Sequence, residues 1–318
     1  MGKKVRGKRA AGGDKAEGPK VTKSADWKKS KCTGPMLTAL SREGLLGPKE
    51  SNTWRLPGGE SSSAPARDER IAFVDFIPRG VSFPLHPFFA ALLCALGVQL
   101  HDLTPNSVQH VACFIVLCEC YLGIAPHWTL FKRIFRMKAQ PSKENPHQIG
   151  GCNIQVKEPN SYLSMGFLES VIGWKYKWFY AKDTENKSNE PLVNLEARVV
   201  QRASWRAALT LEEISQTDDY LHRIEELKNA GLTGVQLSSI FLKRRVQPLR
   251  TRNVFMWEYK GTDDVLRLRA DELSSTELDT FLRQIIKPSE VKTTLSIEPF
   301  SAANPPPAVS SHFTIFPN

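Results

Sequence analysis

The stretch that decides the fold is PFFAALLCALG, residues 87–97, followed by TPNSVQHVACFIVLCECYLG, residues 104–123. The first segment is apolar around almost its whole circumference, and Gly97 is placed to end it, which is typical of a core helix. In the second segment Thr104 is placed as an N-cap and Pro105 as the first helical residue. We therefore predict two consecutive helices at the centre of the fold.

Helix and strand signals alternate around this centre. Apolar, β-branched and aromatic runs predict strands over residues 71–77, 150–156 and 174–180, the last two placed to pair with each other. Apolar spacing and capping boxes predict helices over residues 36–46, 128–137, 210–231, 233–245 and 271–287. The fold class that follows is α+β and mainly helical, with a small antiparallel sheet.

The formal net charge of +10 lies almost wholly at one end of the chain. Residues 1–31 hold eleven Lys and Arg against three acidic residues, whereas the remainder holds 32 basic and 30 acidic residues. Residues 1–33 show no apolar periodicity and cannot bury enough surface to offset chain entropy, so we predict a disordered basic tail. We predict one large globular domain over residues 34–287, with a sub-boundary near 183–195, and a flexible, proline-containing tail over 288–318.

The sequence indicates a soluble, intracellular protein, with the nucleus favoured and no membrane contact. No apolar signal segment follows Met1, and the longest apolar run, Phe88–Val98, is shorter than the roughly 20 residues of a spanning helix. The six cysteines should remain reduced thiols in such a compartment. Cys118 and Cys120 have the wrong separation for a zinc pair, so core packing is favoured over metal binding, and no cofactor is expected.

No catalytic motif is recognisable. An integrase or transposase needs an Asp-Asp-Glu set that holds two divalent metal ions. The carboxylates that could be named for it, without any local signature, are Asp75, Asp102, Asp218 and Glu225. The Asp-Ser/Thr-Gly motif of an aspartic protease is missing, and the aspartates at 263–264 have the wrong spacing for a reverse transcriptase. We therefore predict that the chain is not an enzyme.

The basic tail is the first of three candidate surfaces for nucleic acid. Its cations could neutralise phosphates in a salt-sensitive, sequence-independent way, or act as a nuclear import signal. The residues concerned are Lys3, Lys4, Arg6, Lys8 and Arg9. A solvated tail without either role is the alternative.

The second candidate surface is a helical hairpin over residues 217–245, whose Gly-containing turn suits a helix-turn-helix. Its cations Lys243, Arg244 and Arg245 lie at the far end of the second helix, whereas base contacts in that motif come from its N-terminal part. An ordinary helical hairpin is therefore favoured. Its buried positions would be Leu221, Ile224, Leu227 and Ile240.

The third candidate surface is the predicted strand over 174–180, where aromatic residues interleave with lysines. Aromatic rings can stack on single-stranded bases while lysines follow the phosphates. The residues are Trp174, Tyr176, Trp178 and Tyr180, with Lys175, Lys177 and Lys182. A half-buried strand whose lysines face water is the favoured alternative.

Several short motifs between residues 34 and 287 resemble those of a known family. They are Trp54-Arg55 with Pro57-Gly58, Phe73 to Gly80, Gly97 to Ser107, Cys118-Glu119 with Leu122-Gly123, Trp128, Phe131, Gly150-Gly151, Trp178 to Tyr180, Val246 to Leu249, and Met256-Trp257 with Tyr259. In their order and spacing the chain resembles the gypsy-type transposon domain of grass genomes, a retrotransposon- or transposase-like family. The resemblance implies a plant retroelement origin and names no activity.

These observations predict a retroelement-derived, non-catalytic structural or nucleic-acid-associated protein. Its tail would bind RNA or DNA, and its body would contact protein partners or a second copy. Two alternatives stay open. One is a divergent transposase- or integrase-like enzyme fragment, and the other is a domesticated host DNA-binding or regulatory protein that uses the hairpin over 217–245.

Overall fold

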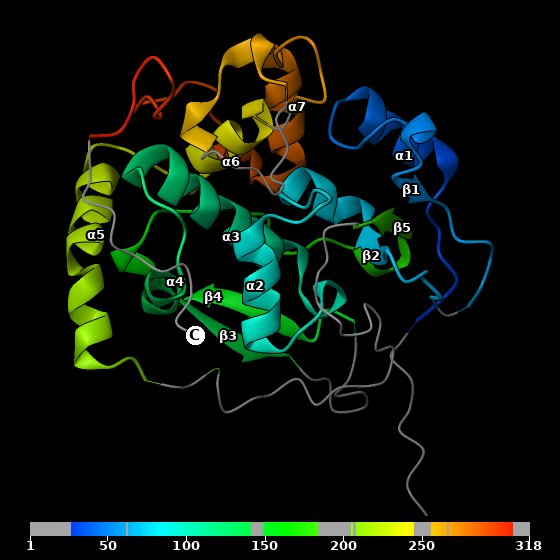
Figure 1. Ribbon diagram of the computed structural model, residues 1–318, viewed down its shortest axis with the longest axis horizontal. Helices are drawn as coiled ribbons and strands as arrows, with labels where there is room; N and C mark the ends of the chain where they lie inside the picture. The colour runs from blue at the N-terminus through cyan, green and yellow to red at the C-terminus, as the bar shows by residue number, and fades with distance from the viewer. Residues whose placement is uncertain are drawn as a thin grey trace, which may run out of the picture.

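Helix α3 (Pro105–Leu117) runs through the middle of the computed structural model, which describes residues 27–61, 63–140, 149–183, 205, 208–244, 256–265 and 267–307. The other helices are α1 (Gly34–Arg42), α2 (Pro87–Leu96), α4 (Trp128–Ile134), α5 (Leu211–Asn229), α6 (Gly234–Lys243) and α7 (Ser275–Ile285). The strands are β1 (Trp54–Arg55), β2 (Glu69–Phe73), β3 (Phe135–Ala139), β4 (Cys152–Val156) and β5 (Trp178–Lys182). Helices α6 and α7 lie on one side of α3 and the β3–β4 pair on the opposite side, with α5 along one edge (Figure 1). The α+β, mainly helical fold class is confirmed.

The two central helices form as their local signals predict. Thr104 caps α3 by accepting a hydrogen bond at 3.3 Å from the amide of Ser107, and Pro105 occupies the first turn. Nearly every residue of α3 is buried, since the helix packs on α6, on β4 and on a 3₁₀ segment over Val74–Arg79. A π-helical turn, Cys118–Leu122, extends it to Gly123, whose φ of 68° ends the helix.

The three-stranded antiparallel sheet has the order β1-β5-β2, with Ile71 opposite Tyr180. The predicted strand over 71–77 is correct only up to Phe73, because Val74–Arg79 forms the 3₁₀ segment instead. Pro78 cannot donate to a strand ladder, and the turn brings the following chain against α3. Within the turn the buried Arg79 guanidinium donates to the carbonyl of Gln284 at 2.9 Å, which ties α7 to the body.

The two-stranded sheet pairs β3 with β4, and both partners differ from prediction. Residues 135–139 form a strand where the sequence predicted the end of a helix, and the segments 150–156 and 174–180 do not pair with each other. The stretch FKRIFRMKA satisfies the helical period up to Ile134 and the strand period after it. The edge of β4 decides between them because it supplies the hydrogen bonds that a strand needs.

The body begins earlier than predicted. Trp27 is 9% exposed and its ring stacks on Phe73 with centroids 6.4 Å apart. The indole Nε1 of Trp178 donates to the carbonyl of Lys28 at 2.9 Å. The predicted disordered tail over 1–33 is therefore wrong for residues 27–33, whereas residues 1–26 lie outside the described part of the chain.

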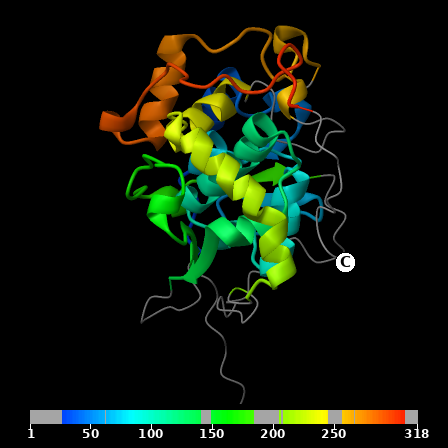
Figure 2. The same ribbon diagram turned by 90° about the vertical axis from the view of Figure 1, so that its left-hand side faces the viewer.

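The body also ends later than predicted. Residues 288–307 run along one edge of the molecule (Figure 2) and contact α6 and the π-helical turn. The amide of Phe300 donates to the carbonyl of Cys120 at 2.7 Å, and the Arg244 guanidinium donates to the Phe300 carbonyl at 2.7 Å. The predicted flexible tail is wrong for residues 288–307, and residues 308–318 lie outside the described part.

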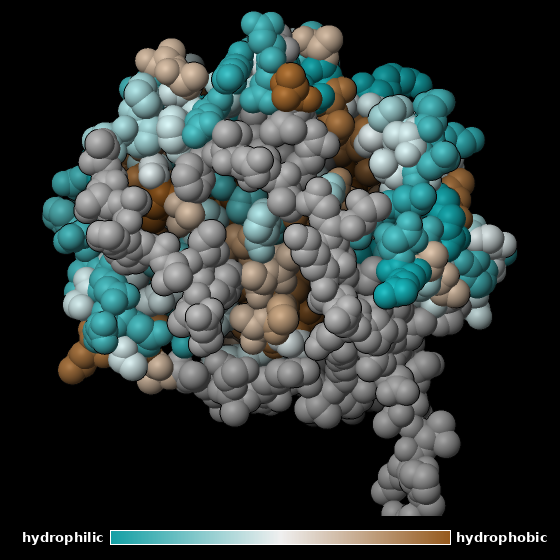
Figure 3. Space-filling model, in the orientation of Figure 1, coloured by the Kyte–Doolittle hydropathy of each residue, from teal (hydrophilic) through white to brown (hydrophobic). Residues whose placement is uncertain are grey.

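The coloured surface in Figure 3 is largely hydrophilic, with an apolar area over α2 between atoms drawn in grey. Cys94 and Ala95 are the exposed side chains of α2. Within the described ranges, the helices lack the combination of length and hydrophobicity that crossing a membrane requires.

Candidate nucleic-acid interface

A concentrated positive charge lies on the unit formed by α4, β3 and β4. Its described residues, 128–140 and 149–157, include five cations and no carboxylate. The cations are Lys132, Arg133, Arg136, Lys138 and Lys157. The unit therefore differs from the rest of the body, in which acidic and basic residues nearly balance.

The register of the β3–β4 ribbon gathers three of these cations on one face. Arg136 lies opposite Gln155 and Lys138 lies opposite Asn153. Because successive side chains of a strand point to opposite faces, Lys157 shares the face of Gln155 and Asn153. We call the surface formed by Arg136, Lys138, Asn153, Gln155 and Lys157 the ribbon face.

The ribbon face is positive and only weakly neutralised by neighbours. The pKa of Lys157 is lowered by partial burial and then by the nearby charges of Lys132 and Arg133, against a smaller opposing effect of the adjacent Glu158. Arg133 pairs with Asp218 of α5 at 3.0 Å. Arg136 and Lys138 are exposed and make no ion pair with any residue in the described part of the chain.

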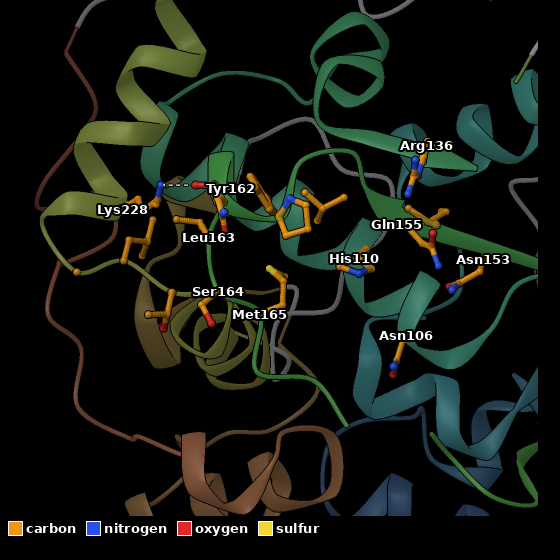
Figure 4. A pocket seen from close by; sticks show the side chains of 17 residues that line it. Asn106, His110, Arg136, Asn153, Gln155, Tyr162, Leu163, Ser164, Met165 and Lys228 are labelled. Atoms are coloured by element: carbon orange, nitrogen blue, oxygen red, sulfur yellow. Dashed lines mark hydrogen bonds between the residues drawn. The ribbon is translucent and has the colours of Figure 1, made fainter. Parts of the chain in front are cut away.

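A groove of about 830 Å³ lies beside the ribbon. Figure 4 shows Arg136, Gln155, Asn153 and Asn106 toward one end of it and Lys228 with Tyr162 toward the other. The ammonium of Lys228 donates to the carbonyl of Asn160 at 2.6 Å. The groove is thus bounded by the ribbon, by the first half of α3, by residues 159–165 and by the turn between α5 and α6.

Neutral hydrogen-bonding groups line this groove beside the cations. The Nδ2 of Asn106 donates to the Leu168 carbonyl at 2.6 Å, while its Oδ1 has no partner among the described residues. The Oδ1 of Asn153 accepts from the Ser107 hydroxyl at 3.0 Å. Burial lowers the pKa of His110 to about 4, so this ring is neutral at pH 7.

The carboxylates considered for an Asp-Asp-Glu set are not brought together. Asp75 pairs with Lys177 at 3.2 Å, Asp218 pairs with Arg133 at 3.0 Å, and Glu225 pairs with Lys228 at 3.0 Å. Asp102 instead accepts from the amide of Gln99 at 2.8 Å. Each carboxylate therefore has a local structural partner.

The cysteines mostly pack in the core. Cys113, Cys118, Cys120 and Cys152 are buried, which confirms core packing for these four, while Cys94 is exposed. Burial raises the pKa of Cys113 to about 12. Among the residues that the structure describes, no group of three or more His, Cys, Asp or Glu side chains could hold a metal ion.

The helical pair over 217–245 does not present the predicted surface. Every residue from Gly234 to Leu242 is buried, so α6 has no free face for a DNA groove and the helix-turn-helix alternative is wrong. Helix α5 packs mainly on α4, whereas α6 packs on α3 and α7, which departs from a simple hairpin. Ile224, Leu227 and Ile240 are buried as predicted, and Leu221 is half-buried.

The predicted basic contacts fall into three groups. Arg244 is only 4% exposed and is committed to the Phe300 carbonyl, so the prediction that it contacts nucleic acid is wrong for this conformation. Lys243 is half-buried and lines a small cavity beside Tyr259. Arg245 and the tail residues Lys3, Lys4, Arg6, Lys8 and Arg9 lie outside the described part of the chain.

The aromatic residues of the segment 174–180 are core residues. Trp174, Trp178 and Tyr180 are 6%, 0% and 0% exposed, so they are not available to stack on bases. Tyr176 is half-buried beneath Lys28 and Lys31, whose ammonium groups lie 5.4 and 5.5 Å from its ring centroid. The stacking alternative is therefore wrong for the three buried rings.

The ribbon face was not predicted from the sequence because residues 128–137 satisfy a helical period. A signal was nevertheless present. In FRMKA the cations alternate with Phe135, Met137 and Ala139, and in CNIQV the amides alternate in the same way. Two such polar-apolar segments predict a paired ribbon with one polar face.

Residues 71–139 match the family described as "Putative gypsy type transposon". The match begins in β2 and extends to the last residue of β3, so it includes the two central helices and the cations of β3. No curated protein and no solved structure matches the chain. Residues 71–139 thus resemble the gypsy-type transposon family, which confirms the family resemblance seen in the sequence and supports a retroelement derivation.

Proposed function

We propose that this retroelement-derived chain is a non-catalytic protein that binds nucleic acid through the ribbon face. The observation that carries the proposal is the register of β3 and β4, which places Arg136, Lys138 and Lys157 on one surface without a carboxylate of their own unit. A row of surface cations is the usual means of holding a phosphate backbone, and Arg136 of this row also lines the groove.

The electrostatics support a polyanion over a merely solvated surface. Alternate residues of a strand are about 6.7 Å apart, so Arg136 and Lys138 form a row and not a single point charge. The mutual repulsion among Lys157, Lys132 and Arg133 contributes to the lowered pKa of Lys157. A bound polyanion would relieve that repulsion, whereas water alone only screens it.

The basic tail supplies a second contact in this proposal. Residues 1–26 precede Trp27, which is the first described residue and packs in the core. Their cations would add sequence-independent, salt-sensitive binding, and the ribbon face would hold the same strand against the body. Removing residues 1–26 should therefore weaken the binding of nucleic acid without abolishing it.

Charge reversal on the ribbon tests the proposal. The variant Arg136→Glu with Lys138→Glu is compared with Lys49→Glu and Lys292→Glu, which make the same change in net charge at exposed positions off the ribbon. Anisotropy of a labelled oligonucleotide at low salt should show an affinity loss of about tenfold or more for the ribbon variant alone. Equal losses in the two variants, with unchanged circular dichroism, would show that the ribbon face is not the binding surface.

A further inference from the structure

The ribbon face is built from repeated pairs of a cation and an amide. Across the two strands Arg136 faces Gln155, and Lys138 faces Asn153. Each pair therefore places one positive group beside one group that can both donate and accept hydrogen bonds. The pair repeats every two residues, about 6.7 Å along the ribbon.

The amides of this face are only partly used by the protein. The side chain of Gln155 makes no hydrogen bond to any residue that the structure describes, and it is half-buried in the groove. Asn153 uses its Oδ1 to accept from Ser107, which leaves its Nδ2 as a donor. Both side chains therefore retain hydrogen-bonding capacity toward a ligand in the groove.

A third amide in the groove has a fixed orientation. Asn106 donates from Nδ2 to the Leu168 carbonyl, which can only accept, so its Oδ1 is the end without a partner in the described part of the chain. A buried acceptor without a partner is unfavourable by about 1–3 kcal/mol until a donor arrives. A phosphate at neutral pH brings acceptor oxygens and cannot supply that donor.

We infer that the groove binds single-stranded nucleic acid and contacts its bases through Gln155, Asn153 and Asn106. This inference rests on the proposed function and specifies its ligand. Each nucleotide brings one anionic phosphate and one base whose edge carries N–H donors and acceptors. That combination matches the cation and amide of each ribbon pair, and the donor of a base edge satisfies Asn106 Oδ1.

A duplex fits the groove less well. The Watson–Crick edges of its bases are already paired, and its volume far exceeds the roughly 300–1,000 Å³ typical of pockets for small ligands. The groove, at about 830 Å³, lies within that range, so it holds a short unpaired segment. An acidic peptide also carries anions and N–H donors, but it has no repeat of one anion and one planar base edge to match the ribbon pairs.

The test compares labelled single strands of one base type each with a duplex of equal length, using the full chain. The wild-type protein should bind the single strands more tightly than the duplex and should distinguish among the bases by about fivefold or more. Gln155→Ala should remove most of that distinction while leaving the salt dependence unchanged. Gln284→Ala, which removes an exposed amide on α7, serves as the control and should leave binding unchanged.

Three outcomes overturn the inference. Equal binding of single strands and duplex, insensitive to Gln155→Ala but weakened by the ribbon charge reversal, would refute base contact and leave the proposed function standing. Binding that the charge reversal does not alter would refute both. In a competition experiment, poly-glutamate of equal charge could displace the bound single strand. If this displacement were also weakened by Gln155→Ala, the groove would be assigned to acidic peptides instead.

Discussion

Neutralising the ribbon face should change the salt dependence of nucleic-acid binding by a predictable amount. The variant Arg136→Gln, Lys138→Gln and Lys157→Gln removes three cations that share one face. Each neutralised phosphate of a single strand contributes about 0.7 to the slope of log affinity against log salt. Loss of three contacts should therefore reduce the slope by about 2. Between about 50 and about 200 mM salt, the affinity of the wild-type protein should fall about 15-fold further than that of the variant.

The measurement is a titration of one labelled single strand by fluorescence anisotropy at several salt concentrations. A control variant, Lys49→Gln with Lys260→Gln and Lys292→Gln, changes net charge equally at exposed sites outside the ribbon face. The slope of log affinity against log salt for this control variant should differ from that of the wild-type protein by less than about 0.5. A ribbon variant whose slope equals that of the control would refute the reasoning, because the three cations would then contact no phosphate.

Three further predictions concern the body. Trp27→Ala should lower the free energy of unfolding by about 3–5 kcal/mol in chemical denaturation, because the ring is buried against Phe73. An unchanged free energy of unfolding would show that Trp27 does not belong to the core. Gly80→Ala should lower it by roughly 2–4 kcal/mol, since φ is 121° and the new Cβ would lie 2.2 Å from a carbon of α3. Gly173 also has a positive φ, but no atom lies near the position of a new Cβ, so Gly173→Ala should lower the free energy of unfolding by only about 1 kcal/mol. Equal losses of stability in the Gly80→Ala and Gly173→Ala variants would contradict the steric argument. Burial lowers the pKa of His110 to about 4. Between about pH 6.5 and pH 4 this ring is therefore protonated in the unfolded chain and neutral in the folded protein. Stability should therefore fall by up to about 3 kcal/mol from pH 6.5 to pH 4 and show no His110 dependence above pH 6.5. In His110→Phe this part of the pH dependence should vanish, and a slope equal to that of the wild-type protein would count against a neutral buried ring.

The central helices could be predicted because their signals are local. Thr104 and Pro105 begin α3, and Gly97 and Gly123 end the two helical segments by adopting positive φ. The capping box at Thr210 begins α5 in the same way, with reciprocal hydrogen bonds to Glu213. Such signals act within one turn of the chain, so they do not depend on what packs against the helix.

The polar-apolar alternation of residues 135–139 and 152–156 indicates two strands with a polar face, but the candidate site itself depends on contacts between segments that are distant in sequence. The stretch 135–139 becomes a strand only because β4 lies beside it, and its cations share a face with Gln155 only through that register. Likewise the buried Arg244, directly after the last residue of α6, donates to the carbonyl of Phe300, which is 56 residues away in the sequence. A charge run read along the sequence therefore does not tell which cations remain at the surface.

The amino-acid sequence by itself thus determined the fold class, the caps that begin α3 and α5, the location of the net charge and the family resemblance. Only the tertiary structure decided that Trp27 belongs to the core, that residues 288–307 lie against the body, and that a cationic ribbon borders a groove. The physical reason is one of range. Capping and periodicity are local properties, whereas burial and strand register arise from contacts between segments that fold together.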